Sequence, residues 1–181
     1  MPNYRRPWIA GGTYFFTLVT HQRHQWLCHP AARRALREAI LTTRHSWPFV
    51  IEAWVLLPDH LHCIWTLPEG DADNAVRWKR IKQMVSQRCN GMITTTLSDS
   101  RASRGETALW QRRFWEHLIR DETDFKQHCD YIHYNPVKHG YCLYPAQWPY
   151  STLKRLIRRG RYPGNWGING KPQIAGDVGH E

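Results

Sequence analysis

The 181-residue sequence lacks any apolar run close to the ~20 residues that a membrane-spanning helix needs. Residues 1–6 also lack the apolar centre of a secretory signal, so we expect a cytoplasmic protein with no membrane partner. The five cysteines are odd in number and scattered, and none belongs to a Cys-x-x-Cys pair. This pattern argues against a disulfide framework or a zinc ribbon and indicates reduced thiols packed as small apolar groups.

Acidic residues are few compared with basic ones. The chain has 15 Asp and Glu against 25 Lys and Arg, and a formal net charge of +10. A polyanion is the partner that such a charge favours. Ten tryptophans and eight tyrosines are interleaved with the charge, a mixture typical of proteins that bind single-stranded nucleic acid. Composition and length together indicate one basic globular domain that binds nucleic acid.

Hydrophobic periodicity predicts an alternation of strands and helices. The expected strands are 13–20, 49–57, 61–67 and 110–120, with a turn at Pro58-Asp59 between the second and the third. Four helices are expected: the first begins at Pro30 and the second spans 73–92. The third follows Asp121, has Phe125, Cys129 and Ile132 on its apolar side, and ends or kinks at Pro136. The fourth lies after residue 150. Residues 94–109 show no periodicity and are expected to form a loop.

This order of elements predicts an α+β fold, with a ferredoxin-like antiparallel sheet and helices packed on one of its faces. We expect residues 1–153 to form the functional domain. Residues 154–181 would add a short basic helix and a Gly/Pro-rich tail, and we expect residues 160–181 of this tail to be weakly ordered.

A pair of histidines in the third strand points to metal chemistry. Residues two apart in a strand face the same side and lie ~6.6 Å apart along the backbone, so His60 and His62 can converge on one ion. Tyr131 and Asn135 are one helical turn apart, within ~6 Å on one helix face. If these four side chains meet, they supply two metal ligands, a third polar ligand and a phenolic nucleophile, which is a phosphodiester-cutting site. A hydrogen-bonded histidine pair without metal is the alternative.

Four sequence motifs carry a family resemblance: Leu57 to His62, Trp110 to Arg120, Asp130 to Gly140 and Trp148 to Ser151. In order and spacing they resemble REP-associated tyrosine transposases, a branch of the single-tyrosine transposases in the His-hydrophobic-His nuclease superfamily. The resemblance spans residues 4 to 153. Thr152 departs from the family, where a second serine is common at this position.

The resemblance implies a domain that binds hairpins of repetitive extragenic palindromic (REP) DNA and cleaves and rejoins single strands beside them. It makes Tyr131 the nucleophile, on a helix beside the metal-binding strand, and His60, His62 and Asn135 the metal ligands. The implied product is a 5′-phosphotyrosine link with a free 3′ hydroxyl. We expect activity with Mg²⁺ or Mn²⁺, although nitrogen ligands fit Mn²⁺ better by softness. Tyr134 is the competing nucleophile, but it has no Asn at i+4.

Basic residues are the candidate DNA contacts, and each of them is equally explained as a solvated charge. They are Arg5, Arg6, Arg77, Lys79, Arg80, Lys82, Arg112, Arg113, Lys138, Arg155 and Arg158. By resemblance we expect a monomer that works at nucleoid DNA, since no feature of the sequence demands a dimer interface.

Three other functions fit parts of the pattern. A replication initiator or relaxase of the same superfamily uses the same chemistry, but this short chain lacks their further domains. A regulator that binds DNA hairpins without cutting them needs none of the four proposed active-site residues. A metal-dependent hydrolase of small phosphoesters does not explain the net charge.

Overall fold

The computed structural model describes residues 9–91, 109–176 and 178–179. Its strands are β1 (Thr13–Val19), β2 (Val50–Leu56), β3 (His60–Thr66) and β4 (Trp115–Leu118). Its helices are α1 (Pro30–Ser46), α2 (Asn74–Arg88), α4 (Glu122–Lys138) and α5 (Leu153–Arg158), with 3-10 turns η1 (His21–Arg23) and η2 (Pro145–Gln147). The side chains of His29, Asp73 and Asp121 cap α1, α2 and α4 by accepting hydrogen bonds from backbone amides of the first turn.

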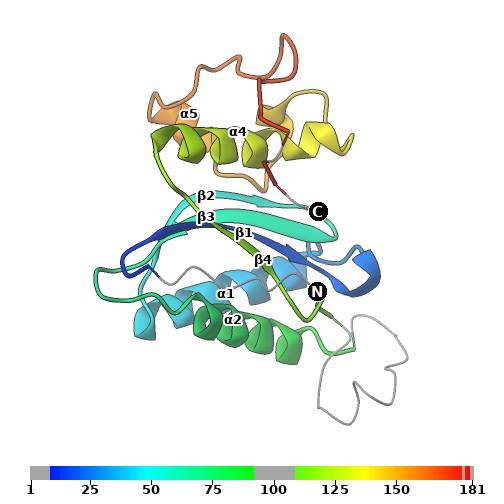
Figure 1. Cartoon of the computed structure of the whole chain (residues 1–181). Coiled ribbons are helices and arrows are strands. Elements are labelled where there is room, and N and C mark those ends of the chain that lie inside the picture. Colours follow the sequence, from blue (N-terminus) through cyan, green and yellow to red (C-terminus); the bar gives the residue numbers. More distant parts are fainter. Residues whose placement is uncertain (1–8, 92–108, 177, 180–181) are drawn as a thin grey trace.

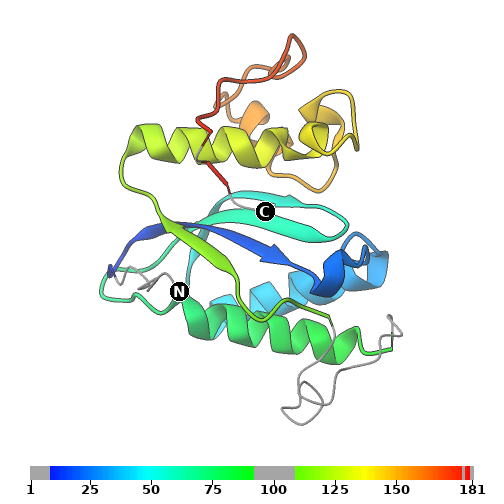
Figure 2. The ribbon, with the colours of Figure 1, turned by 45° about the vertical axis from the view of Figure 1, so that its right-hand side comes forward.

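The four strands form one antiparallel sheet in the order β2-β3-β1-β4. With α1 between β1 and β2, and α2 between β3 and β4, this is the ferredoxin-like arrangement, and the predicted fold class is confirmed. Helices α1 and α2 cover one face of the sheet, whereas α4 lies across the opposite face (Figures 1 and 2). The molecule therefore has three layers. The sequence pattern predicted helices on one face of the sheet and did not reveal that α4 packs on the opposite face from α1 and α2.

Alternation along β1 explains how both faces are filled. Tyr14 and Phe16 belong to the core beneath α1 and α2, together with the stacked Trp65 and Trp78. Phe15 points the other way and packs with the apolar residues of α4. A strand that is covered on both faces is hydrophobic at nearly every position, as the buried run of β1 shows.

Several element boundaries differ from the sequence prediction. Helix α2 ends at Arg88 rather than at Met92, and β4 covers only the middle of the expected strand 110–120. Helix α4 continues two residues beyond Pro136 before it ends. Most of the expected loop at 94–109 lies outside the described residues.

The described part of the C-terminal tail packs against α4, which contradicts the expectation of weak order. The Tyr162 hydroxyl donates to Asp130 Oδ1 at 2.7 Å, and the Ala175 amide donates to Gln127 Oε1 at 2.7 Å. Val178 is buried beside α4. Aromatic and apolar residues dispersed among glycines and prolines anchor this segment without forming a periodic pattern. Among the described residues no helix is long and apolar enough to cross a membrane.

The outer edge of β2 is occupied by the segment that leads into α5. The Leu56 amide donates to the Tyr150 carbonyl at 2.9 Å, and the Thr152 amide donates to the Trp54 carbonyl at 3.0 Å. Thr152 Oγ1 also accepts from the Trp54 amide at 2.9 Å and lies 2.9 Å from Nε2 of the buried His133. Burial, and then the nearby charge of Arg155, lower the pKa of His133 to about 3. Thr152 thus joins the sheet edge to α4.

Candidate functional site

Strand β3 directs both histidines toward α4. His60 and His62 are fully buried, their ring centroids are 5.0 Å apart, and Leu61 between them faces the opposite core. The Phe15 ring on β1 stacks on the His62 imidazole at 5.5 Å between centroids. The predicted convergence of the two imidazoles on one side of the sheet is therefore present.

Neighbouring polar groups orient the two imidazoles. His60 Nδ1 donates to Asp59 Oδ1 at 2.6 Å, and Thr17 Oγ1 lies 2.9 Å from His62 Nδ1. Burial by itself would raise the pKa of the Asp59 carboxyl, but the hydrogen bonds and charges of His60 and Arg23 outweigh burial and lower it. Because both Nδ1 atoms make these contacts, a metal ion bound by the two rings would be held through Nε2.

Asn135 brings an oxygen ligand from α4. Its Oδ1 lies 3.3 Å from His60 Nε2, and the side chain is fully buried. Two ligands that bind one divalent ion at a right angle are about 3 Å apart when each bond is about 2.1 Å. In the tautomer that carries its proton on Nδ1 and donates it to Asp59, His60 Nε2 and Asn135 Oδ1 are two acceptors that face each other. A cation between them satisfies both, so His60, His62 and Asn135 fit a divalent metal ion.

Tyr131 lies one turn before Asn135 on the same face of α4. Its ring centroid is 5.2 Å from that of His62, and Lys138 Nζ donates to its phenol oxygen at 3.3 Å. The structure therefore brings together His60, His62, Asn135 and Tyr131, which we call the imidazole–phenol site. Tyr134, in contrast, points to the tail, where its ring is 6.4 Å from that of Trp166.

Val178 and Gly179 of the tail cover the Tyr131 ring. Val178 shares a buried cluster with Tyr131 and Ile132. Gly179 has a φ of +75° and approaches the ring so closely that a Cβ at this position would collide with it. The sequence pattern gave no sign of this contact because the tail carries no periodic signal.

A second group of side chains with the spacing to hold a metal ion lies on the same side of the sheet. Ligand atoms of His117, Asp124 and His128 all lie within 4.8 Å of one another. Asp124 Oδ2 accepts from His117 Nε2 at 2.8 Å, and burial is outweighed by the hydrogen bonds of His117 and Arg120, which lower the pKa of Asp124 to about 2. The sequence pattern did not reveal this group, because its members come from β4 and from the first two turns of α4.

His139 was also missed as a neighbour of the imidazole–phenol site. Its ring centroid lies 5.0 Å from that of His60. As the C-cap residue of α4, it is brought there by the last turn of the helix. The spacing of four residues from Asn135 is the sequence signal that would have placed it nearby.

The candidate DNA contacts have different surroundings. Arg77 is fully buried and binds Asp71 Oδ2 at 2.6 Å and the Pro48 carbonyl at 2.8 Å, so its assignment as a DNA contact is wrong. Lys82 donates to the Gln111 carbonyl at 2.6 Å. The exposed candidates are Lys79, Arg80, Arg112, Arg113, Lys138 and Arg158. Of these, Lys138 touches the imidazole–phenol site, whereas Lys79 and Arg80 belong to α2 on the opposite face of the sheet.

Three candidates remain. Arg155 is half-buried at the β2 edge of the sheet. Arg5 and Arg6 lie outside the described residues.

Comparison with known proteins places this chain and its fold in a family. A family model described as "Transposase IS200 like" matches residues 9–135. The chain thus belongs to the IS200-like transposases, and within them to the REP-associated tyrosine transposases. It is 43% identical to the REP-associated tyrosine transposase of Escherichia coli K12 over 98% of this chain and 93% of that protein.

Two further comparisons agree. The chain is 40% identical to a putative REP-associated tyrosine transposase of Haemophilus influenzae, over 98% of this chain and the full length of that protein. It is also similar to a solved structure of a REP-associated tyrosine transposase bound to a REP hairpin. The TM-score is 0.78 at 43% identity, over all of this chain and 95% of that chain.

Proposed function

We propose that this chain is a metal-dependent endonuclease and strand transferase that binds REP-type DNA hairpins and cuts the adjacent single strand through a 5′-phosphotyrosine at Tyr131. The observation that carries the proposal is the meeting of His60, His62 and Asn135 with the Tyr131 ring between β3 and α4. The hairpin named for the solved relative supports the choice of DNA substrate.

Cleavage exchanges one ester bond at the phosphorus for another. The Tyr131 phenol gives up its proton to solvent and its oxygen bonds to the phosphorus, the bond from phosphorus to the 3′ oxygen breaks, and the departing oxygen takes up a proton from solvent to become a 3′ hydroxyl. Lys138 donates to the attacking oxygen, while Asp59 and Thr17 hold the imidazoles in place. His60, His62 and Asn135 would hold a Mg²⁺ or Mn²⁺ ion, and when bound it would supply positive charge beside the phosphate oxygens.

Rejoining reverses the same bonds. A 3′ hydroxyl attacks the phosphotyrosine, the phosphodiester forms again, and the phenol of Tyr131 is restored. Because the ester keeps the energy of the broken linkage, no ATP is required. We place this reaction on a monomer working at nucleoid DNA in the cytoplasm, with residues 1–153 carrying the chemistry and residues 154–181 as an extension.

A covalent-adduct experiment tests the proposal. The protein is incubated with Mn²⁺ or Mg²⁺ and a labelled hairpin that carries single-stranded flanks, and adducts are resolved on a denaturing gel. We expect an adduct from the wild type and from Tyr134→Phe, and none from Tyr131→Phe, with binding on a native gel unchanged. Addition of EDTA or the change His60→Ala should remove cleavage and leave hairpin binding.

The outcomes separate the alternatives. An adduct formed by Tyr131→Phe would overturn the choice of nucleophile. A wild type that shifts the hairpin without an adduct in either metal would be a regulator that binds and does not cut. If the protein does not interact with the hairpin, a metal-dependent hydrolase of small phosphoesters is the alternative that remains.

A further inference from the structure

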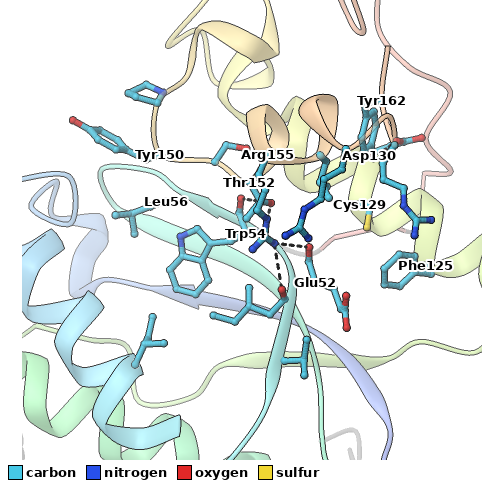
Figure 3. A pocket seen from close by; sticks show the side chains of 18 of the residues that line it. Glu52, Trp54, Leu56, Phe125, Cys129, Asp130, Tyr150, Thr152, Arg155 and Tyr162 are labelled. Atoms are coloured by element: carbon cyan, nitrogen blue, oxygen red, sulfur yellow. Dashed lines mark hydrogen bonds between the residues drawn. The ribbon is translucent and has the colours of Figure 1, made fainter. Parts of the chain in front are cut away.

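A groove of about 1320 Å³ runs along the β2 edge of the sheet (Figure 3). Its walls come from α1, β2, α4 and the segment from Pro149 into α5, and we call it the β2-edge groove. Its described lining includes none of the four residues of the imidazole–phenol site. At this volume it exceeds the roughly 300–1000 Å³ of a small-molecule pocket, which points to a macromolecular ligand.

The charge of the groove favours an anion. Six arginines line it: Arg33, Arg37, Arg44, Arg155, Arg159 and Arg161. The three carboxylates in the same lining are Glu52, Glu122 and Asp130. Asp130 is already neutralised, because Lys126 Nζ and the Tyr162 hydroxyl bind its two oxygens at 2.9 and 2.7 Å. The arginines therefore dominate the electrostatic potential of the groove.

Arg155 is held only weakly by the protein. Its Nη2 reaches the carbonyls of Ile51 and Glu52 at 3.4 Å each, and Figure 3 shows the side chain extending from α5 across β2. Its buried Nε has no hydrogen-bond partner among the described residues. A guanidinium with such long bonds retains donor capacity for phosphate oxygens.

Aromatic rings are placed among these charges. The Arg33 guanidinium lies over the Tyr150 ring, 4.4 Å from its centroid. Trp54 and Phe125 are half-buried in the same lining (Figure 3). Unpaired bases stack on aromatic side chains while arginines follow the phosphates, whereas a duplex hides its base faces within its own stack. The combination favours a single strand over a double-stranded stem.

We propose that the β2-edge groove binds the single-stranded DNA that flanks the hairpin, with Arg37 and Arg159 on phosphates and Tyr150 stacking on a base. This inference rests on the proposed function, because it assumes a DNA hairpin with unpaired flanks. It assigns flank binding to the sheet edge, apart from the residues that carry out cleavage.

The test compares two hairpins and two matched double variants. Fluorescence anisotropy measures the affinity for a hairpin with single-stranded flanks and for the same hairpin without them. The groove variant is Arg37→Ala/Arg159→Ala. The control is Arg34→Ala/Lys154→Ala, which removes two exposed charges from α1 and α5 that do not line the groove.

We expect the groove variant to bind the flanked hairpin about tenfold more weakly, with its salt slope reduced by about 1.4, the value for two single-strand phosphates. Its affinity for the flankless hairpin should stay unchanged. Tyr150→Leu should also weaken flanked binding by about tenfold, but without changing the salt slope. The control variant should match the wild type.

Three results would overturn the assignment: equal losses for both hairpins, equal losses in the groove and control variants, or tighter binding of an RNA flank than of a DNA flank. Failure of the proposed function gives a different pattern. In that case the wild type forms no Tyr131 adduct, while flank binding still depends on Arg37 and Arg159. A wild type that binds neither hairpin overturns both.

Discussion

At the scale of single residues, spacing predicted which side chains share a face but not what surrounds them. His60 and His62 alternate along a strand, and the interval from Tyr131 to Asn135 is one helical turn, so both pairings are visible in the sequence. Thr17 meets His62 only because the antiparallel register of β1 and β3 makes them partners. Register depends on the whole sheet, and the orienting groups were therefore not predictable.

Asp59 offers a test of how the imidazole–phenol site is oriented. Asp59→Asn removes the carboxylate that accepts from His60 Nδ1, and loss of such a partner lowers metal affinity by about 10–100-fold. We expect calorimetry with Mn²⁺ and no DNA to show this loss, and adduct formation to need correspondingly more Mn²⁺. Glu69→Gln, at an exposed carboxylate, is the control. Unchanged Mn²⁺ affinity in Asp59→Asn would remove His60 from the metal site.

Lys138 offers a test of the nucleophile. Lys138→Met removes the positive charge beside the Tyr131 oxygen, where negative charge is present during attack. Since this lysine is exposed, we expect about a tenfold slower adduct formation at saturating DNA, measured in a single turnover. Lys138→Arg should recover part of the rate. A variant that loses hairpin affinity but keeps the wild-type rate would make Lys138 a DNA contact alone.

At the scale of elements, the start of each helix was easier to predict than its surroundings. His29, Asp73 and Asp121 were readable as boundaries because they directly precede helical periodicity. Arg77, however, was assigned to solvent because of its charge. The carboxylate that allows its burial is Asp71, in the turn before α2, and this pairing requires the tertiary fold.

The Asp71–Arg77 pair should anchor the beginning of α2. Removing one partner of a buried pair leaves an uncompensated charge, so we expect Asp71→Ala to lower the free energy of unfolding by about 3 kcal/mol in urea titrations. The double change Asp71→Ala/Arg77→Met should recover part of that loss, because no buried charge remains. A double variant less stable than the single one would contradict this explanation.

The same pair predicts a pH dependence. The hydrogen bond from Arg77 lowers the pKa of Asp71 in the folded protein. The contribution of the Asp71 carboxylate to folding stability is therefore complete above its unfolded-state pKa of ~3.9, and it is lost as the pH falls through its pKa in the folded protein. Urea titrations at chosen pH values between about 6 and 3 should show that acid lowers the free energy of unfolding less in Asp71→Ala than in the wild type. Parallel curves for the two proteins would argue against the pair.

At the scale of the whole molecule, the order of elements was enough to predict the sheet topology. It did not reveal that α4 covers the second face, because a helix with one apolar side can pack on either face of a sheet. The tail escaped prediction for a related reason: Tyr162 and Val178 are anchored by individual contacts that have no period.

The net charge of +10 predicts a strong dependence of DNA binding on salt. If six or more phosphates are neutralised, the affinity for a flanked hairpin should fall by about 10³ between 50 and 200 mM salt. Anisotropy titrations across this range measure the slope directly. An affinity that barely changes with salt would mean that base contacts, rather than the basic surface, provide most of the binding energy.

The segment from Tyr150 to Thr152 has a consequence for how copies of this protein behave together. An exposed edge strand is a template on which another chain can add a strand. Here the Leu56 amide and the Trp54 carbonyl and amide of β2 are already bonded to that segment. This stretch of β2 is therefore closed to a strand from a second copy, so two molecules cannot join into one continuous sheet through it.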